Sequence, residues 1–297
     1  MDITEKKDLK ARWGWIDSHA HLDMKDFDPD RGEVLQRAWD QGFAAVITIG
    51  IDLESSRQAV ALAGAEARVW ATVGLHPHEA GGFDSRQVSE IKSLIANEKV
   101  LAVGEVGLDF FRNYAPPARQ KECFRAMIAL AREVSRPLVV HDREAHEDVL
   151  NILKEEKAEE VGGIFHCFSG DWPMARRCLD LHFLLSVTGA LTYKKGSILE
   201  EVVRRAPLES LLLETDAPFL TPHPFRGKRN EPVQLLHTAA RMAEIRRMGL
   251  EELGRVIYEN TCRAFRKKFK SEIRSTKSET NTNFQNSNDQ NRNRFEF

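Results

Sequence analysis

Short runs of apolar and β-branched residues alternate along the chain with segments whose apolar residues recur at helical spacing. The helical segments include residues 54–67, 118–134 and 143–156. The apolar runs number eight and cover residues 15–22, 44–50, 69–78, 101–110, 137–143, 163–170, 182–190 and 211–220. Strands that alternate with helices predict parallel βαβ units, and eight such units in roughly 250 residues are typical of a (β/α)8 barrel of the TIM type.

The alternative architecture is a doubly wound open sheet, which is built from the same βαβ units. A dinucleotide-binding sheet of that kind carries a GxGxxG turn after its first strand, and no such turn follows residue 22. We therefore expect an α/β protein with one barrel domain over residues 14–268. Residues 1–13 form an N-terminal extension in this interpretation, and residues 269–297 form a polar tail. From residue 271 the chain is rich in Asn, Ser, Thr and Gln and has almost no aliphatic residues, which predicts disorder.

Histidines and carboxylates stand on most of the expected strands, mainly toward their C-terminal ends. They are His19 and His21 on the first strand, His76 on the third, Glu105 on the fourth, His141 on the fifth, His166 on the sixth and Asp216 on the eighth. In a barrel the C-terminal ends of all strands meet at one mouth, which is where active sites are built. The pattern therefore predicts that these side chains converge on one cavity.

The sequence WIDSHAHLD, residues 15–23, raises the question of what satisfies two imidazoles in an apolar strand. His19 and His21 share a strand face, because side chains at i and i+2 point the same way. One interpretation is a pair of core histidines bonded to the backbone or to Asp17, and the other is a chelating pair on a metal ion.

The whole set favours the metal. The four imidazoles of His19, His21, His141 and His166 and the two carboxylates are costly in one cavity unless cations neutralise and coordinate them. Six protein ligands also exceed what one open catalytic zinc-like ion takes, so we expect two divalent metal ions. Imidazole ligands favour Zn, Mn, Co or Fe over Mg, but metal availability can override affinity, so Zn, Mn and Mg all remain candidates. A third ion is also left open.

The motifs DSHAHLD, GLHPHE, GEVGLDF, HDREAHED, HCFSG and ETDAPFLTP occur in this order, and RGKRNEP and ENTCRAF follow. With them the chain resembles, over residues 14–268, the TatD-type metal-dependent deoxyribonucleases, a family of amidohydrolase-like barrels. The resemblance implies hydrolysis of DNA phosphodiester bonds with divalent metal. It also implies that His19, His21 and Asp216 hold one ion, that His141 and His166 hold the other, and that Glu105 bridges the two.

Further roles follow from position or from the resemblance. Asp216 is the candidate to orient a water molecule and accept its proton, so Asp216 and Glu105 are the catalytic candidates. His76 resembles the family's substrate-side histidine, and Arg143 and Arg112 could face a phosphate group. Glu214 shares a strand face with Asp216, as an orienting group, a further ligand or a carboxylate beneath the site.

Two supporting carboxylates are expected as well. Asp17 should support the histidine pair from below, and Asp109 should fix its own loop.

Charge indicates a nucleic-acid partner only in local parts of the chain. The 297 residues carry a formal net charge of -2, so nothing global indicates a nucleic-acid partner. Basic residues nevertheless occur in the loops that should open on the mouth: Arg112, Lys194, Lys195, Arg226, Lys228 and Arg229. These residues could steer a polyanion to the site.

The expected function is therefore an exonuclease acting on single-stranded DNA or DNA ends, with RNA as a rival substrate. An amide or ester hydrolase is the alternative enzyme, although many such barrels carry a carboxylated lysine on the fourth strand and none occurs in residues 101–110. A metal-loaded nucleic-acid-binding protein without catalysis is the other alternative, and the presence of Asp216 argues against it.

Cellular context follows from what the sequence lacks. The four cysteines form no CxxC pair, residues 1–10 lack a signal-peptide core, and no apolar run is long enough to span a membrane. We expect a cytoplasmic monomer with no membrane partner.

Overall fold

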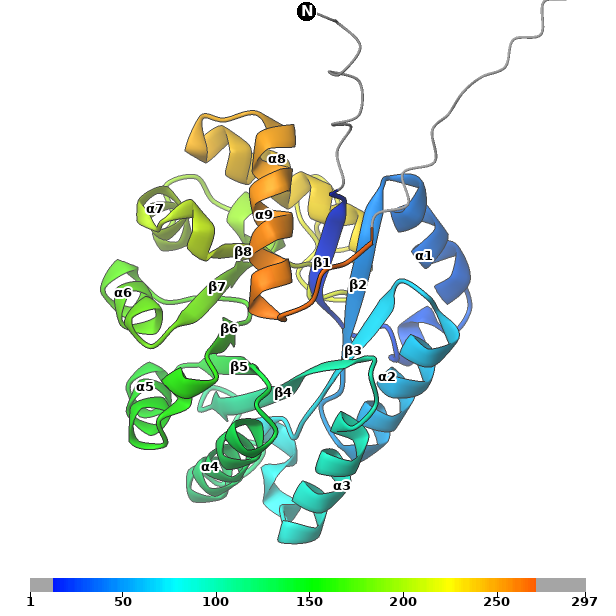
Figure 1. Ribbon diagram of the computed structural model, residues 1–297. Coiled ribbons are helices and arrows are strands. Elements are labelled where there is room, and N and C mark those ends of the chain that lie inside the picture. Colours follow the sequence, from blue (N-terminus) through cyan, green and yellow to red (C-terminus); the bar gives the residue numbers. More distant parts are fainter. Residues whose placement is uncertain (1–12, 271–297) are drawn as a thin grey trace, which may run out of the picture.

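Eight parallel strands form one sheet in sequence order, as a barrel requires (Figure 1). The computed structural model describes residues 13–270, so the N-terminal extension before residue 13 and the polar tail from residue 271 lie outside the described residues. The strands are β1 (Trp15–Ala20), β2 (Phe43–Ile49), β3 (Val69–Val73), β4 (Val100–Asp109), β5 (Leu138–Arg143), β6 (Gly163–Phe165), β7 (Phe183–Val187) and β8 (Leu211–Leu213).

Helices follow the strands and surround the sheet (Figure 1). They are α1 (Arg31–Asp40), α2 (Leu53–Ala65), α3 (Ser85–Ile95), α4 (Pro117–Glu133), α5 (His146–Glu155), α6 (Trp172–Asp180), α7 (Ile198–Arg205), α8 (Leu235–Arg246) and α9 (Leu250–Ala264). Several begin where a side chain satisfies free backbone N–H groups: Asp52 accepts from Ser55 N before α2, and Asp84 accepts from Gln87 N before α3. The predicted (β/α)8 barrel is confirmed.

The barrel closes where the chain after β8 meets β1. Ala20 and Ala217 form a parallel bridge, His21 N donates to Ala217 O at 2.8 Å, and Asp216 N donates to His19 O at 2.9 Å. We call these bonds the β1–β8 seam. The seam therefore includes His19, His21 and Asp216, which are three residues of the expected metal site.

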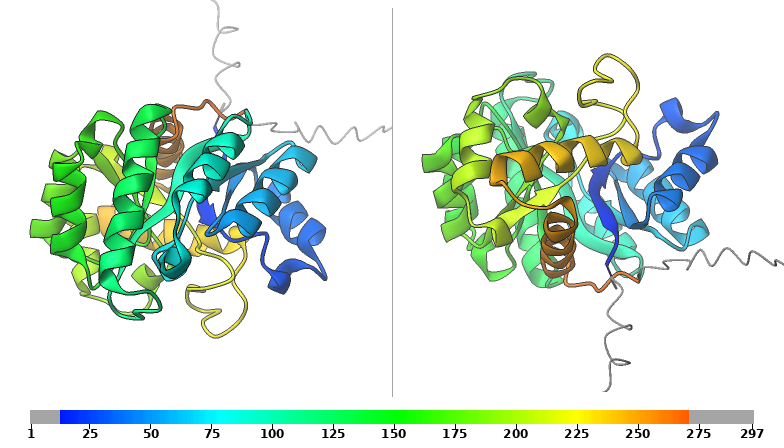
Figure 2. Two further views of the ribbon diagram at one scale, coloured as in Figure 1. Left: turned by 90° about the horizontal axis from the view of Figure 1, so that it is seen from below. Right: turned by 90° about the horizontal axis from the view of Figure 1, so that it is seen from above.

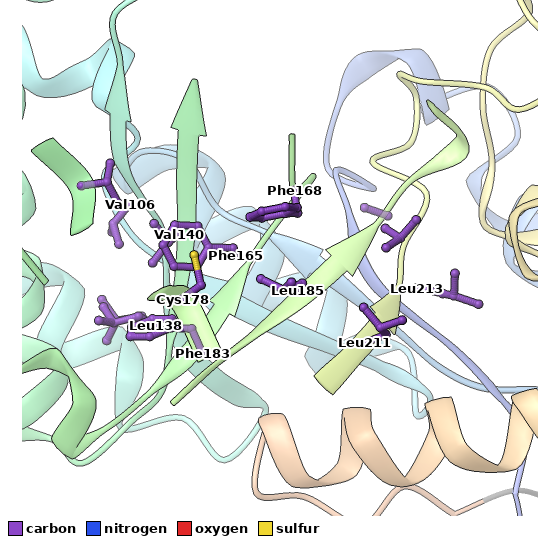
Figure 3. Packing of buried hydrophobic residues seen from close by; sticks show 14 of the residues in the cluster. Val106, Leu138, Val140, Phe165, Phe168, Cys178, Phe183, Leu185, Leu211 and Leu213 are labelled. Atoms are coloured by element: carbon purple, nitrogen blue, oxygen red, sulfur yellow. The ribbon is translucent and has the colours of Figure 1, made fainter. Parts of the chain in front are cut away.

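Alternation along each strand separates two apolar layers. Ile164 and Leu212 belong to a cluster with residues from the other strands, inside the barrel. Their sequence neighbours, such as Phe165 and Leu213, belong to the larger cluster between strands and helices. Figure 3 shows part of this outer layer, where Phe165 and Leu185 pack near Cys178 of α6. The barrel interior is thus packed with side chains, so a binding site must lie at an end of the barrel and not inside it.

Helix α9 covers the N-terminal end of the barrel. α9 contacts β1 and β8, and it approaches so closely at Gly254 that a Cβ there would lie 2.3 Å from the Trp13 ring (Figure 1). Beyond α9, Phe269 is buried and its ring lies 5.8 Å from that of Trp70. Figure 2 places the loop that follows β8 at the other end of the barrel from this segment. The N-terminal end of the barrel is therefore sealed, while the C-terminal end carries long loops.

Candidate metal centre

All seven histidines and carboxylates singled out by their strand positions meet at the C-terminal mouth of the barrel. His19, Glu105 and His141 lie within strands, whereas the other four follow a strand end within a few residues. A cavity of about 640 Å³ opens there, and six of the seven line it: His21, His76, Glu105, His141, His166 and Asp216. The seventh, His19, lies beneath them and is fully buried.

His19, His21 and Asp216 form the first group of donor atoms. The two Nε2 atoms of the histidines lie 3.4 Å apart, and Asp216 Oδ1 lies 3.4 Å from His21 Nε2 and 3.7 Å from His19 Nε2. These three ligand atoms are close enough together to bind one ion. The i, i+2 spacing of the two histidines thus brings their rings to a common point.

Glu105 links this group to a second one. Its Oε2 lies 3.4 Å from His19 Nε2, while its Oε1 lies 2.7 Å from His141 Nδ1 and 3.1 Å from His166 Nε2. The two oxygens of one carboxylate therefore face two separate sets of imidazole nitrogens. That is the geometry a carboxylate needs in order to bridge two cations.

Two carboxylates behind His141 and His166 determine which ring nitrogen of each histidine carries the proton. Asp109 Oδ2 lies 3.2 Å from His141 Nε2, and Glu214 Oε1 lies 3.0 Å from His166 Nδ1. A carboxylate at one ring nitrogen favours the proton on that nitrogen and leaves the lone pair of the other nitrogen for a metal. Both lone pairs then face Glu105. Glu214 also accepts a hydrogen bond from Cys167 N at 2.6 Å, so it holds the start of this loop as well.

His76 differs from these histidines. Its Nδ1 accepts a hydrogen bond from the backbone N of His78 at 3.1 Å, and its Nε2 lies 3.5 Å from Glu105 Oε1. By distance alone, His76 could be a third ligand beside Glu105 and His141. However, burial and the neighbouring His141 hold the pKa of His76 well below its usual value, so the ring is neutral. An Nδ1 that accepts a hydrogen bond then leaves the proton on Nε2, which makes His76 a donor rather than a ligand.

Electrostatics show a site built around positive charge. Burial by itself would raise the pKa of Glu105, but the His166 and His76 imidazoles hold it well below its usual value. Burial opposes protonation of His166, yet Glu105 and Glu214 hold its pKa well above the usual value. Glu105 is thus ionised, and the imidazoles around it balance its charge. Divalent cations suit this donor set, because they satisfy the carboxylates and leave the imidazoles neutral.

Asp216 lies in a conformation that few L residues adopt. Its φ is 57°, in the left-handed region, which costs a non-glycine residue roughly 1 kcal/mol or more. The β1–β8 seam holds this conformation on one side, and Phe219 N donates to Asp216 O at 2.8 Å on the other. Strain of this kind persists only when surrounding bonds enforce it, and here it orients a carboxylate toward the histidine pair.

Asp17 lies under the histidine pair, but it does not contact their rings. It accepts hydrogen bonds from Thr215 N at 2.9 Å, from the Thr215 hydroxyl and from the backbone N of His19 at 3.3 Å. Burial raises its pKa to about 8. Asp17 therefore joins β1 to the chain after β8 through hydrogen bonds. Among the described residues, the Nδ1 atoms of His19 and His21 are buried without a hydrogen-bond partner.

The basic residues expected at the mouth divide into two kinds. Arg112 and Arg143 line the cavity, and neither forms a salt bridge within residues 13–270. Arg229, by contrast, pairs with Asp30 at 2.7 Å and donates to Asp26 O, so its charge is committed to holding its loop. Lys194, Lys195, Arg226 and Lys228 are not among the residues that line the cavity, so of the basic residues expected at the mouth only Arg112 and Arg143 are placed to meet an anion there.

Aromatic residues at the mouth were missed when only polar residues were considered as candidates. Phe111, Tyr114 and Phe219 are 50%, 67% and 50% exposed, although they belong to residue types that are usually buried. A signal was present: Phe-Phe directly follows GEVGLD, and Phe219 lies within ETDAPFLTP. Apolar residues in a motif that follows a strand end need not belong to the core.

A buried set of imidazoles and carboxylates at the C-terminal mouth of a (β/α)8 barrel defines the chain as a metal-dependent hydrolase. The family model described as "TatD related DNase" matches residues 16–266. The chain belongs to this family, which confirms the resemblance found in its motifs.

Curated relatives support the assignment over nearly their whole length. The chain is 44% identical over 251 residues to "Uncharacterized metal-dependent hydrolase YabD" of Bacillus subtilis, covering 84% of this chain and 98% of the relative. It is 35% identical over 257 residues to "3'-5' ssDNA/RNA exonuclease TatD" of Musicola paradisiaca, covering 84% and 97%. Among solved structures, the TatD homologue YJJV of Escherichia coli matches with a TM-score of 0.80 and 31% identity, covering 85% of this chain and 98% of the other.

One further observation concerns membranes. Within residues 13–270, no helix combines the length and the apolar character that crossing a bilayer requires.

Proposed function

We propose that this protein hydrolyses phosphodiester bonds in single-stranded DNA, with single-stranded RNA as a second substrate, and that it does so at chain ends with two divalent cations. The observation that carries the proposal is the division of Glu105 between two donor sets, with Oε2 toward His19 and Oε1 toward His141 and His166. The relative named as a 3'-5' ssDNA/RNA exonuclease supports the choice of substrate.

Each residue of the cluster has a distinct task in this proposal. His19, His21 and Asp216, whose donor atoms lie together, would hold one cation. His141 and His166, which both lie beside Glu105 Oε1, would hold the other, with Glu105 between the two cations. When bound, such a pair of cations stabilises charge on a phosphoryl group and lowers the pKa of water. Asp216, whose side chain is 13% exposed, orients the attacking water and accepts its proton.

Other residues of the mouth position the substrate. His76 donates its Nε2 proton to a phosphate oxygen, which its neutral ring allows without a counter-charge. The guanidinium groups of Arg112 and Arg143, which line the cavity and form no salt bridge within residues 13–270, attract the flanking phosphates. A mouth of this depth admits a single strand more easily than a duplex, whose bases are paired and stacked.

The test uses chelator-stripped protein and end-labelled single-stranded DNA, with Mn²⁺, Zn²⁺ or Mg²⁺ added separately. Cleavage that requires added metal and is lost in Asp216→Asn supports the proposal. If the folded protein cleaves neither DNA nor RNA with any of these metals, the proposal is wrong. Amide and ester substrates are then screened with the same metal-loaded protein.

A further inference from the structure

Exposed aromatic rings gather at the mouth of the barrel. Within residues 13–270, the large apolar side chains that are exposed are Phe111, Tyr114, Ile198, Phe219 and Leu250. The three aromatic members all lie in the loops that follow β4 and β8, and Tyr114 and Phe219 line the metal-site cavity itself. Burial is the favoured state of rings of this size, so exposed rings beside a site indicate a ligand that covers them.

The rings lie on two opposite sides of the mouth. Phe111 and Tyr114 follow β4, whereas Phe219 follows β8, and the sheet order β1 to β8 places these two strands half a turn apart around the barrel. Phe219 lies beside the centre, with its ring 6.1 Å from the His21 ring. On the other side the Tyr114 ring is 4.7 Å from the ring of His78, which shares Asp109 Oδ2 with the metal-site residue His141. A chain that crosses the mouth therefore meets an aromatic ring before and after the centre.

The positive charges beside the rings would attract a polyanion. The Arg143 guanidinium lies 4.1 Å from the centre of the Phe111 ring, and that of Arg112 lies 5.6 Å from it. An aromatic ring beside guanidinium groups is the combination with which proteins bind single strands, because the ring stacks on a base while the cations attract the backbone.

The β4 side is held firmly in place. Asp109 Oδ1 accepts a hydrogen bond from Arg112 N at 2.7 Å, and Gln120 donates to Ala115 O at 2.8 Å. These bonds fix both ends of the segment that carries Phe111 and Tyr114. A loop whose backbone is already held in place loses little freedom when a base stacks on its rings, which strengthens binding.

We infer that Phe111 and Tyr114 on one side, and Phe219 on the other, form an aromatic clamp that stacks on bases of single-stranded nucleic acid on either side of the phosphate at the metal centre. The inference rests on the proposed function and names the part of the substrate that the protein recognises. Stacking is tolerant of sequence, because every base has an aromatic face. The clamp therefore selects unpaired bases without selecting a base type.

The experiment separates bases from phosphates. Binding to Mn²⁺-loaded Asp216→Asn protein is measured by fluorescence anisotropy with two probes: a labelled short oligothymidylate, and a strand of the same length whose residues are all abasic tetrahydrofuran. Tyr114→Ala and Phe219→Ala are introduced separately into this background. Phe219→Trp keeps a ring, and Leu250→Ala is the control for loss of an exposed apolar side chain elsewhere.

Each alanine variant should bind oligothymidylate roughly five- to a hundredfold more weakly, the loss expected for one stacked base. The same variants should bind the abasic strand as their parent does, and Phe219→Trp and Leu250→Ala should leave both affinities unchanged. The clamp is overturned if the alanine variants bind oligothymidylate like their parent, or if the parent binds oligothymidylate no more tightly than the abasic strand.

Cleavage by protein that retains Asp216 distinguishes the clamp from the proposed function. Metal-dependent cleavage with no effect of the aromatic substitutions on binding or KM leaves the proposed function in place and removes the clamp. Ring-dependent binding of oligothymidylate without cleavage under any metal supports the clamp and removes the proposed nuclease. Because all three rings are exposed, their removal should leave the folded structure intact, which circular dichroism checks.

Discussion

Asp109 and Glu105 approach the His141 ring from opposite nitrogens: Asp109 Oδ2 lies 3.2 Å from Nε2, and Glu105 Oε1 lies 2.7 Å from Nδ1. The ring is thus held between a carboxylate that fixes its proton and a carboxylate at the centre of the site. Asp109 also accepts from Arg112 N and lies 3.0 Å from His78 Nε2. One buried side chain therefore sets the orientation of a metal-site histidine and of the loop above it.

We expect Asp109→Asn to weaken binding of one cation by roughly ten- to a hundredfold, the loss typical when a carboxylate behind a ligating histidine is removed. The asparagine keeps the shape, so the fold should survive. Isothermal titration with Mn²⁺ measures the affinity, and Asp148→Asn, which changes a surface carboxylate paired with Lys121, is the control. Unchanged affinity for both cations would contradict the positioning role of Asp109.

Glu105→Ala should abolish pairing of the cations and with it the hydrolytic activity, because the two oxygens of Glu105 face the two donor sets, whereas Glu214 is engaged with His166 Nδ1 and Cys167 N. Metal content per folded chain, measured by elemental analysis after dialysis, should fall from two ions to one or none. Glu79→Ala removes another carboxylate that lines the cavity and should leave the metal content unchanged. A Glu105→Ala protein with two ions and full activity would refute the assigned bridge.

Gly104→Ala should destabilise the protein by about 1 to 3 kcal/mol, the usual cost of overpacking a core. A Cβ at Gly104 would lie 2.6 Å from Val139 Cβ and 2.7 Å from Val139 O, so β4 and β5 must separate next to Glu105. Urea unfolding measures the free energy, and metal affinity should fall with it. Gly64→Ala in α2, where nothing lies within 4 Å of the added Cβ, should not lower stability. Equal stability of the two variants would show that the approach at Gly104 is not tight.

A pH-dependent contribution to stability is expected from His146 on α5. Its hydrogen bond to Asp142, at 2.8 Å, raises its pKa, and burial opposes the shift while Asp171 and Glu147 add to it. A raised pKa in the folded state means that the stabilisation is complete below the unfolded pKa of about 6.5 and is lost as pH rises through the folded pKa. His146→Gln should therefore destabilise the protein more at pH 5.5 than at pH 8.5. Urea unfolding at both pH values tests this, and a larger loss at the higher pH would reverse the assigned sign.

The fold could be predicted because its signal in the sequence is local. Val139 faces the inner layer and Val140 the outer layer, so a strand that is buried on both faces is recognised as a short run of apolar residues without any knowledge of its partners. Metal-site candidates could be found for a related reason: the barrel carries the ends of all strands to one mouth, so position within a strand was enough to bring Glu105 and His166 together.

Other parts of the site depend on contacts that spacing does not encode. In His76 and His166 alike the Nδ1 atom is engaged, and the difference lies in its partner: a backbone N–H donates to Nδ1 of His76, whereas the Glu214 carboxylate faces Nδ1 of His166. Asp109 was expected only to fix its loop, since nothing in the sequence tells that β4 and β5 pair with Leu108 opposite Asp142. The register between strands supplied what the sequence alone lacked.

The β1–β8 seam connects the first donor group to both the first and the last strand of the barrel. His19 and Asp216 are joined by a backbone hydrogen bond, so Asp216 joins the histidine pair only when the chain after β8 has closed against β1. During synthesis on the ribosome, a nascent chain that ends before Asp216 holds an incomplete centre. Completion of the donor set therefore depends on the part of the chain that is made last in the barrel.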